Sequence, residues 1–284
     1  HTLSSINNLG APLYAQGRYT EAEEHYSEAL EGRRRTLGDE HPHTLSSINN
    51  LGAPLYAQGR YTEAEEHYSE ALEGRRRTLG DEHPDTLDSL AWLGRLSLTE
   101  GNLLQRPGKL AEAAPLLRKA LEARRRVLGE EHHDTLSSRC SLGLLFLSQG
   151  KLDQAEPHLR DALEAQRRLL GEEHYQSLNS AKALGDLRRA QGKLDEAEAL
   201  LAPALAALRR TRGEESSAAL SCAQSMGRLL RDQGELGRAE ELLRETLAAS
   251  ERTFGSEHPR THATARVLEA LLAERPGETA ATED

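Results

Sequence analysis

The sequence predicts an all-α protein in which helical hairpins stack as a solenoid, and three observations carry this prediction. Residues 1–42 recur without a single change as residues 43–84, and four more divergent copies follow. Within each copy, apolar residues recur at helical spacing in two runs, which indicates two helices. Each copy also contains a Leu-Gly pair, and the glycines of these pairs are Gly10, Gly52, Gly94, Gly143, Gly185 and Gly227.

The first helix of each repeat is predicted from its apolar face. In the first copy, Leu3, Ile6 and Leu9 share one face with Leu13, so we expect a helix over roughly residues 2–16. Gly17 ends it. In the later copies we expect Thr44 or Asp85 to cap the corresponding helix. The predicted repeats are residues 1–42, 43–84, 85–133, 134–175, 176–217 and 218–259.

The second helix is predicted to begin near Thr20, a good N-cap that precedes three glutamates. Arginines occupy its last turns, where cations suit the helix dipole, and Gly38 ends it. Its apolar stripe consists of Ala22, Tyr26, Ala29, Leu30 and Leu37.

Two segments depart from the repeat. Seven extra residues, 102–108, lie at the predicted turn between the helices of the third repeat, where an insertion lengthens the turn and leaves both helices intact. After the sixth repeat, residues 260–275 are predicted to form one more helix that caps the array. Residues 276–284 are small, polar and acidic, and we expect a disordered tail.

Composition narrows the functional classes. Hydrophobic residues make up 37% of the chain and charged residues 29%, as expected for an array with much surface per residue. The net charge of −10 argues against non-specific nucleic-acid binding. No apolar run is long enough to span a membrane, and the two cysteines lie two repeats apart, which favours a reducing compartment. We therefore predict a cytoplasmic protein with no nucleic-acid partner and no membrane insertion.

The repeat resembles the tetratricopeptide repeat, whose signature is matched by Leu9-Gly10 in the first helix and by Ala22, Tyr26 and Ala29 in the second. The period of 42 residues and the joint Glu-His-Pro-Asp-Thr-Leu at residues 82–87 are similar to the kinesin light chain subclass. The resemblance covers residues 1–275. It implies a right-handed superhelical solenoid, a single array of hairpins, that holds protein or peptide partners without catalysis.

The resemblance also implies a binding groove lined by the first helices. Kinesin light chains are thought to hold acidic, aromatic-containing cargo peptides there. The corresponding positions change from polar and aromatic to cationic along the chain, so an extended acidic peptide is the expected ligand. Asp186 and Asp232 could instead neutralise the cations through surface pairs of little energetic worth. The predicted groove residues are Asn7, Tyr14, Asn49, Tyr56, Arg95, Leu144, Leu147, Lys182, Arg189, Arg228 and Arg231.

No catalytic, cofactor or metal site is predicted. The chain has no HExxH or GxSxG motif, and the glycines between residues 101 and 110 lack the spacing of a phosphate-binding loop. Zinc ligands must converge on one point, and only His132 and His133 are locally paired. A histidine nevertheless recurs at the joint after each of five repeats, as His41, His83, His132, His174 and His258.

Two other functions stay open. The chain opens inside a repeat, which is typical of a piece of a larger protein, and the array could be the sensor or regulatory part of a signalling NTPase. The partner would be a motor complex if the array resembles kinesin light chains in function, and a signalling complex if it is a sensor. The unchanged duplication also fits a structural or engineered array without a specific ligand.

Overall fold

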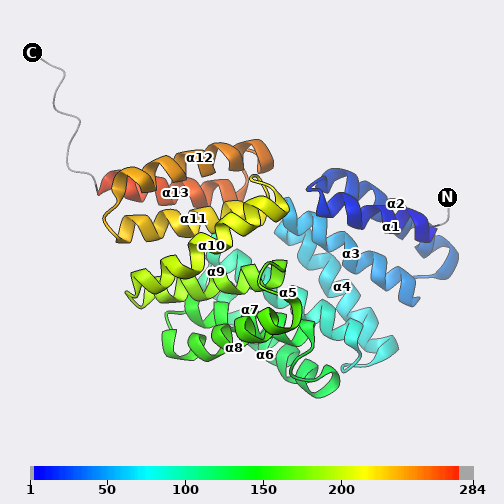
Figure 1. The fold of residues 1–284 in the computed structure, drawn as a ribbon. Coiled ribbons are helices and arrows are strands. Elements are labelled where there is room, and N and C mark those ends of the chain that lie inside the picture. Colours follow the sequence, from blue (N-terminus) through cyan, green and yellow to red (C-terminus); the bar gives the residue numbers. More distant parts are fainter. Residues whose placement is uncertain (1–2, 275–284) are drawn as a thin grey trace, which may run out of the picture. The chain divides into compact units, whose positions relative to one another are not determined.

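The computed structural model describes residues 3–274, which form thirteen α-helices (Figure 1). This confirms the all-α stack of hairpins. Along the described chain, no helix is both long and apolar enough to cross a membrane. The helices are α1 (Leu3–Ala15), α2 (Tyr19–Leu37), α3 (Pro42–Ala57), α4 (Tyr61–Leu79), α5 (Pro84–Leu103), α6 (Pro107–Leu128), α7 (His133–Ser148), α8 (Leu152–Leu170), α9 (Tyr175–Ala190), α10 (Leu194–Arg212), α11 (Ser217–Asp232), α12 (Leu236–Phe254) and α13 (Pro259–Ala273).

The helices fall into two compact units, one ending at Gln149 and one beginning at Gly150. In the first unit, α1/α2, α3/α4 and α5/α6 form hairpins, and each second helix also packs against the first helix that follows it. In the second unit, α9/α10 and α11/α12 form hairpins that stack in the same way, with α8 packed on α9 and α13 on α12. The six-repeat division and the single array stay predictions, and the predicted tail lies outside the described residues.

The Leu-Gly glycines let the two helices of a hairpin approach closely. A Cβ added to Gly10 or Gly52 would lie 2.6 Å from the ring of Tyr26 or Tyr68 on the partner helix. Such a distance is far inside van der Waals contact, so only glycine fits. At Gly94, Gly185 and Gly227 the atom in the way belongs to a leucine of the partner helix.

The recurring joint histidines cap helices. The Nδ1 atom of His83 accepts a hydrogen bond from the backbone N–H of Asp85 at 3.2 Å, and the other four joint histidines make the same contact. The prediction that Thr44 or Asp85 caps these helices is therefore wrong. So is Thr20 as the N-cap of the second helix, because α2 begins at Tyr19 and its N-cap residue makes no side-chain bond. In both cases the helix begins earlier than local propensity suggested, with its N-cap two or three residues before the predicted one.

A buried polar contact fastens each hairpin of the first unit to the next. Arg33 on α2 donates to the hydroxyl of Ser47 on α3 at 2.7 Å and to the carbonyl oxygen of His43 at 3.0 Å. Arg75 and Arg124 repeat this clamp one and two hairpins later, on Ser89 and Ser138. In the second unit the clamp becomes neutral: Ser180 donates to Gln166 at 2.6 Å, and the corresponding positions in the next hairpin hold the buried residues Leu208 and Cys222.

The seven extra residues lengthen α5 and α6 and not the turn, so the prediction of a longer turn is wrong: three residues, 104–106, separate these helices, as 58–60 separate α3 from α4. α5 continues to Leu103, α6 begins at Pro107, and Gln105 between them has a positive φ of 53°. Glu100 is buried and forms ion pairs with Arg106 at 3.1 Å and Lys109 at 3.6 Å. Lys109 also bonds a glutamate of α4, so the extended start of α6 is tied to the preceding hairpin.

Candidate functional site

The first unit carries a cluster of half-buried side chains on α3 and α5, two of them aromatic. We call it the aromatic surface, and its members are Tyr56, Trp92, Arg95 and Thr99. The hydroxyl groups of Tyr56 and Thr99 lie 2.8 Å apart in a hydrogen bond that joins α3 to α5. The guanidinium of Arg95 lies 4.4 Å from the centre of the Trp92 ring. These side chains form a fixed aromatic and cationic patch that solvent can reach.

Trp92 is held in place from beneath. Its ring stacks on that of Tyr68, with centroids 5.6 Å apart and an interplanar angle of 8°. Tyr68 is fully buried, so the platform rests on the core of the hairpin. Sequence reasoning placed Trp92 outside the predicted groove. Its i, i+3 spacing to Arg95 on one helix was a signal that could have found the pair.

Other predicted groove residues of the first unit lie apart from this surface. Asn49 is buried, and its Oδ1 accepts a hydrogen bond from Ser89 at 2.8 Å. Asn7 accepts from Ser47 at 3.3 Å in the same way, so both asparagines join neighbouring hairpins. Tyr14 is half-buried against Tyr19, with ring centroids 5.5 Å apart. On α7, Leu144 and Leu147 are both half-exposed and apolar.

The second unit carries four of the predicted groove residues, which we call the cationic surface: Lys182 and Arg189 on α9, and Arg228 and Arg231 on α11. Two carboxylates lie among them. Lys182 pairs with Asp186 at 2.8 Å. Asp232 pairs with both Arg189, at 2.6 Å, and Arg231, at 3.0 Å. Glu274 lies 3.9 Å from Arg231 as a third carboxylate. Four cations thus face three anions, and the surface keeps an excess of positive charge.

The electrostatics of this surface keep its charges in place. Burial would raise the pKa of the Asp186 carboxyl, but the charge and hydrogen bond of Lys182, with smaller contributions from Ser225 and Arg228, lower that pKa below its usual value. Burial lowers the pKa of the Arg228 guanidinium, the charge of Asp186 opposes this shift, and Arg189 and Arg231 add to it by repulsion, yet an arginine stays protonated at neutral pH.

Arg228 differs from its neighbours in its partners. Lys182, Arg189 and Arg231 each form an ion pair. Arg228 is attracted by the charge of Asp186 but forms no hydrogen bond or ion pair with any residue between 3 and 274. Its side chain is half-buried. A partly desolvated guanidinium with five N–H donors and no acceptor is chemically suited to an incoming carboxylate or other anion.

Comparisons with known proteins agree with this architecture. The tetratricopeptide repeat family matches residues 2–43 and 44–85, and again residues 96–168, 142–210 and 176–252. No curated protein matches the sequence.

Solved structures give the same result. A Podospora anserina protein named as a kinesin light chain with nearly identical repeats is 27% identical, covers 74% of this chain and 99% of that chain, and has a TM-score of 0.56. BtubC of P. vanneervenii is 19% identical over 100% of this chain and 98% of its own, with a TM-score of 0.53. NprR in complex with its cognate peptide NprX is 14% identical over 95% of this chain and 74% of its own, with a TM-score of 0.65. The last two show the fold alone.

Proposed function

The chain belongs to the tetratricopeptide repeat family, resembling its kinesin light chain-like members, and we propose that it is a non-catalytic scaffold that binds an extended acidic peptide on the cationic surface. Repeat folds of this family serve as protein–protein interaction scaffolds. The observation that carries the finer proposal is Arg228, a half-buried cation without an acceptor.

A carboxylate of the ligand would complete the arrangement around Arg228. Arginine binds carboxylates in a bidentate fashion, and such charge-assisted hydrogen bonds are stronger than neutral ones. Arg189 and Arg231 share one carboxylate, Asp232, so each guanidinium keeps donors for a second acidic group. An acidic peptide that follows α9 and α11 would therefore meet several cations in succession.

The aromatic surface gives the first unit a seat of its own for aromatic or apolar side chains. Trp92 and Tyr56 offer ring faces and edges, and Arg95 stacks on Trp92 without spending its N–H donors. Aromatic anchors of this kind, in fixed positions, contribute much of the affinity of peptide interfaces. NprR binds a peptide, which supports a peptide as the ligand class of this chain. A peptide ligand is compatible with a role in a motor complex and with a role as the sensor part of a signalling protein.

We place the protein in the cytoplasm as part of this proposal. Burial raises the pKa of the Cys222 thiol to about 12, so the group stays a thiol and behaves as a small apolar core residue. Such a thiol suits a reducing compartment.

The test is the affinity of the full chain for a fluorescently labelled peptide of alternating Glu, Asp and Trp, measured by anisotropy at low and moderate salt. We expect Arg228→Ala to weaken binding at least tenfold, about 1.4 kcal/mol. The matched control is Arg252→Ala, because Arg252 is an exposed arginine of α12 that pairs with Glu215 away from this surface. Unchanged affinity in Arg228→Ala, or no affinity of the wild type for the peptide, would contradict the proposal.

A further inference from the structure

The joint between α6 and α7 holds a group of side chains that the other joints lack. At joints whose histidine is followed by another residue type, that residue is Pro42, Pro84, Tyr175 or Pro259. Here it is a second histidine, His133, and Asp134 follows it. We propose that His132, His133 and Asp134 form an open binding site for a divalent transition metal ion such as Zn²⁺.

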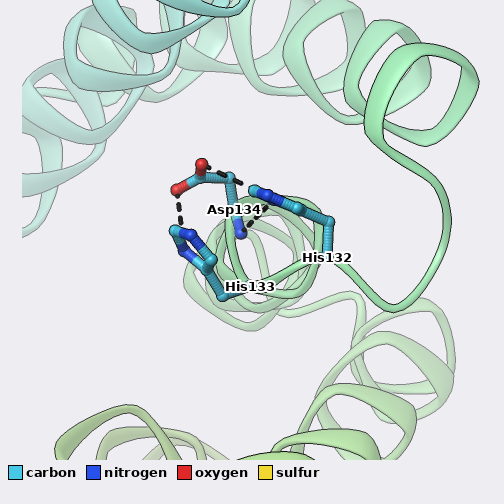
Figure 2. A group of neighbouring side chains, drawn as sticks. All are labelled: His132, His133 and Asp134. Carbon is cyan, nitrogen blue, oxygen red and sulfur yellow. Dashed lines mark hydrogen bonds and ion pairs between the residues drawn. The ribbon is translucent and has the colours of Figure 1, made fainter.

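The three side chains already converge (Figure 2). Each offers one ligand atom, and these atoms lie within 4.8 Å of one another. The Nδ1 atoms of His133 and His132 lie 3.2 Å and 3.6 Å from the two carboxylate oxygens of Asp134. Ligands bound to one zinc ion at 2.0–2.2 Å in a tetrahedron are about 3.3–3.6 Å apart. The two distances from the imidazoles to Asp134 are already close to that spacing.

The backbone beneath the site is fixed. The carbonyl oxygen of Asp134 accepts a hydrogen bond from the buried guanidinium of Arg124 at 3.2 Å, and the two imidazole rings stack with centroids 4.3 Å apart. Coordination through Nδ1 of His132 would replace its bond from the Asp134 N–H, which is 3.3 Å long. The site therefore exchanges one long hydrogen bond for a metal–ligand bond.

The donor set selects the class of ion. Two imidazoles and one carboxylate suit Zn²⁺ and its neighbours in the first transition row better than Ca²⁺ or Mg²⁺, which take oxygen ligands. Three protein ligands leave a fourth position for water, the arrangement of open zinc sites. His133 is more than half exposed, so an ion can enter from solvent.

The chain contains a matched comparison for this site. At the joint before α5, His83 and Asp85 occupy the same places, 3.9 Å apart, but Pro84 between them offers no ligand atom. That joint shares the cap, the carboxylate and the helix terminus, and it lacks only the second imidazole. A helix terminus alone therefore does not account for binding at the joint of His132.

The test is isothermal titration of the full-length chain, free of any affinity tag and of bound metal, with ZnCl₂ at neutral pH. We expect the wild type to bind one Zn²⁺ at this joint. His133→Pro gives the joint the His-Pro-Asp pattern of residues 83–85, with proline at the favoured first helical position, and should weaken zinc binding at least tenfold. His132→Asn keeps a good N-cap acceptor and should have the same effect.

His83→Asn is the matched control and should leave zinc affinity unchanged. Circular dichroism of each variant would show that its helices are intact. Because protons compete with the metal for imidazole nitrogen, affinity should also fall when the titration is repeated in acid. The proposal is overturned if the wild type takes up no zinc, if His133→Pro binds as tightly as the wild type, or if His83→Asn weakens binding as much as His132→Asn.

Discussion

Helices α1 and α3 share one sequence from Leu3 and Leu45, respectively, to their last residue, yet they differ in what covers them. Leu9 on α1 is 47% exposed, whereas the identical Leu51 on α3 is 6% exposed. Leu13 is half-buried, and its counterpart Leu55 is fully buried. The difference is that α2 packs on α3, while α1 begins the described chain. A leucine in a repeat becomes core only when a neighbouring repeat supplies the other half of the contact.

Two other contacts are the same in both copies. Gly10 and Gly52 face the tyrosine of their own second helix at the same distance. Arg33 and Arg75 are each 5% exposed, because each has a following hairpin to bond. The identical copies therefore match at these two contacts and differ in the burial of the upstream face of the first helix.

The largest expected difference between the copies is at the leucine of the Leu-Gly pair. Leu51→Ala should lower the free energy of unfolding by about 2–4 kcal/mol, because it opens a cavity between α2 and α3. Leu9→Ala, the same change on an exposed face, should cost less than about 0.5 kcal/mol. Urea denaturation of the two variants measures both values. Equal losses in free energy of unfolding would show that Leu9 is buried against another surface in solution and would contradict the comparison between α1 and α3.

The arginine clamps should respond equally. Arg75→Ala removes the donor to Ser89 and to the carbonyl oxygen of Asp85, and we expect a loss of about 2 kcal/mol. Arg33→Ala should cost the same within about 0.5 kcal/mol. The control is Arg77→Ala, on the exposed face of α4, which should change stability little. A large inequality between Arg33→Ala and Arg75→Ala would break the claim that the downstream sides match.

The prolines within the first helices give a smaller contrast. α1 and α3 continue through Pro12 and Pro54, each of which lacks the N–H for one backbone hydrogen bond. The aligned residue of α5 is the buried Leu96. Pro54→Leu should therefore stabilise the protein by about 1 kcal/mol, and Pro12→Leu by less, because its new side chain gains little burial. Thermal unfolding, with amide hydrogen exchange of α1 and α3, would measure this, and a loss of stability in Pro54→Leu would contradict it.

The smallest expected effect is on the pH dependence of stability. Burial lowers the pKa of His67 on α4, with nearby charges adding smaller effects of both signs. The unfolded chain therefore binds a proton at this residue more readily than the folded one, so the stability is complete above the pKa of the unfolded state and declines as the pH falls below about 6.5. Denaturation at pH 7.5 and 5.5 should show a smaller decline in His67→Gln than in the wild type. An equal decline would show that other groups carry it.

The sequence was sufficient for the hairpins because the period, the glycines and the apolar stripes all report contacts within one repeat. It failed where a side chain's role depends on the neighbouring repeat. Asn49 of the second repeat aligns with Ala91 of the third, and Trp92 is the residue after Ala91. A step of one residue along a helix turns a side chain by about 100°. Which of these positions faces the next hairpin depends on how the helices cross, so Asn49 was placed in the groove and lies buried, and Trp92 was left out of it and lies on the aromatic surface.

The caps were missed for a related reason. Thr20 and Thr44 have high N-cap propensity, but the glycine turns and the joint histidines fix where each helix begins. The convergence of Asp134 with two imidazoles was likewise out of reach, because it needs the side-chain directions of three adjacent residues at a helix start. The excess of cations on the second unit was predicted from the repeat spacing alone. That Arg228 forms no ion pair could not be predicted, because it depends on which carboxylates the neighbouring cations bind.

The contact between α2 and α3 has a consequence for inheritance. Because these helices belong to two identical copies, the repeat already fits against itself, and adding or removing 42 residues in frame creates no interface that the chain lacks. Unequal recombination between the gene segments that encode the two copies would therefore lengthen or shorten the protein by one hairpin. Each resulting interface would be of the same kind as the contact between α2 and α3. The number of repeats can change in a single genetic event, and the reach of the scaffold changes with it.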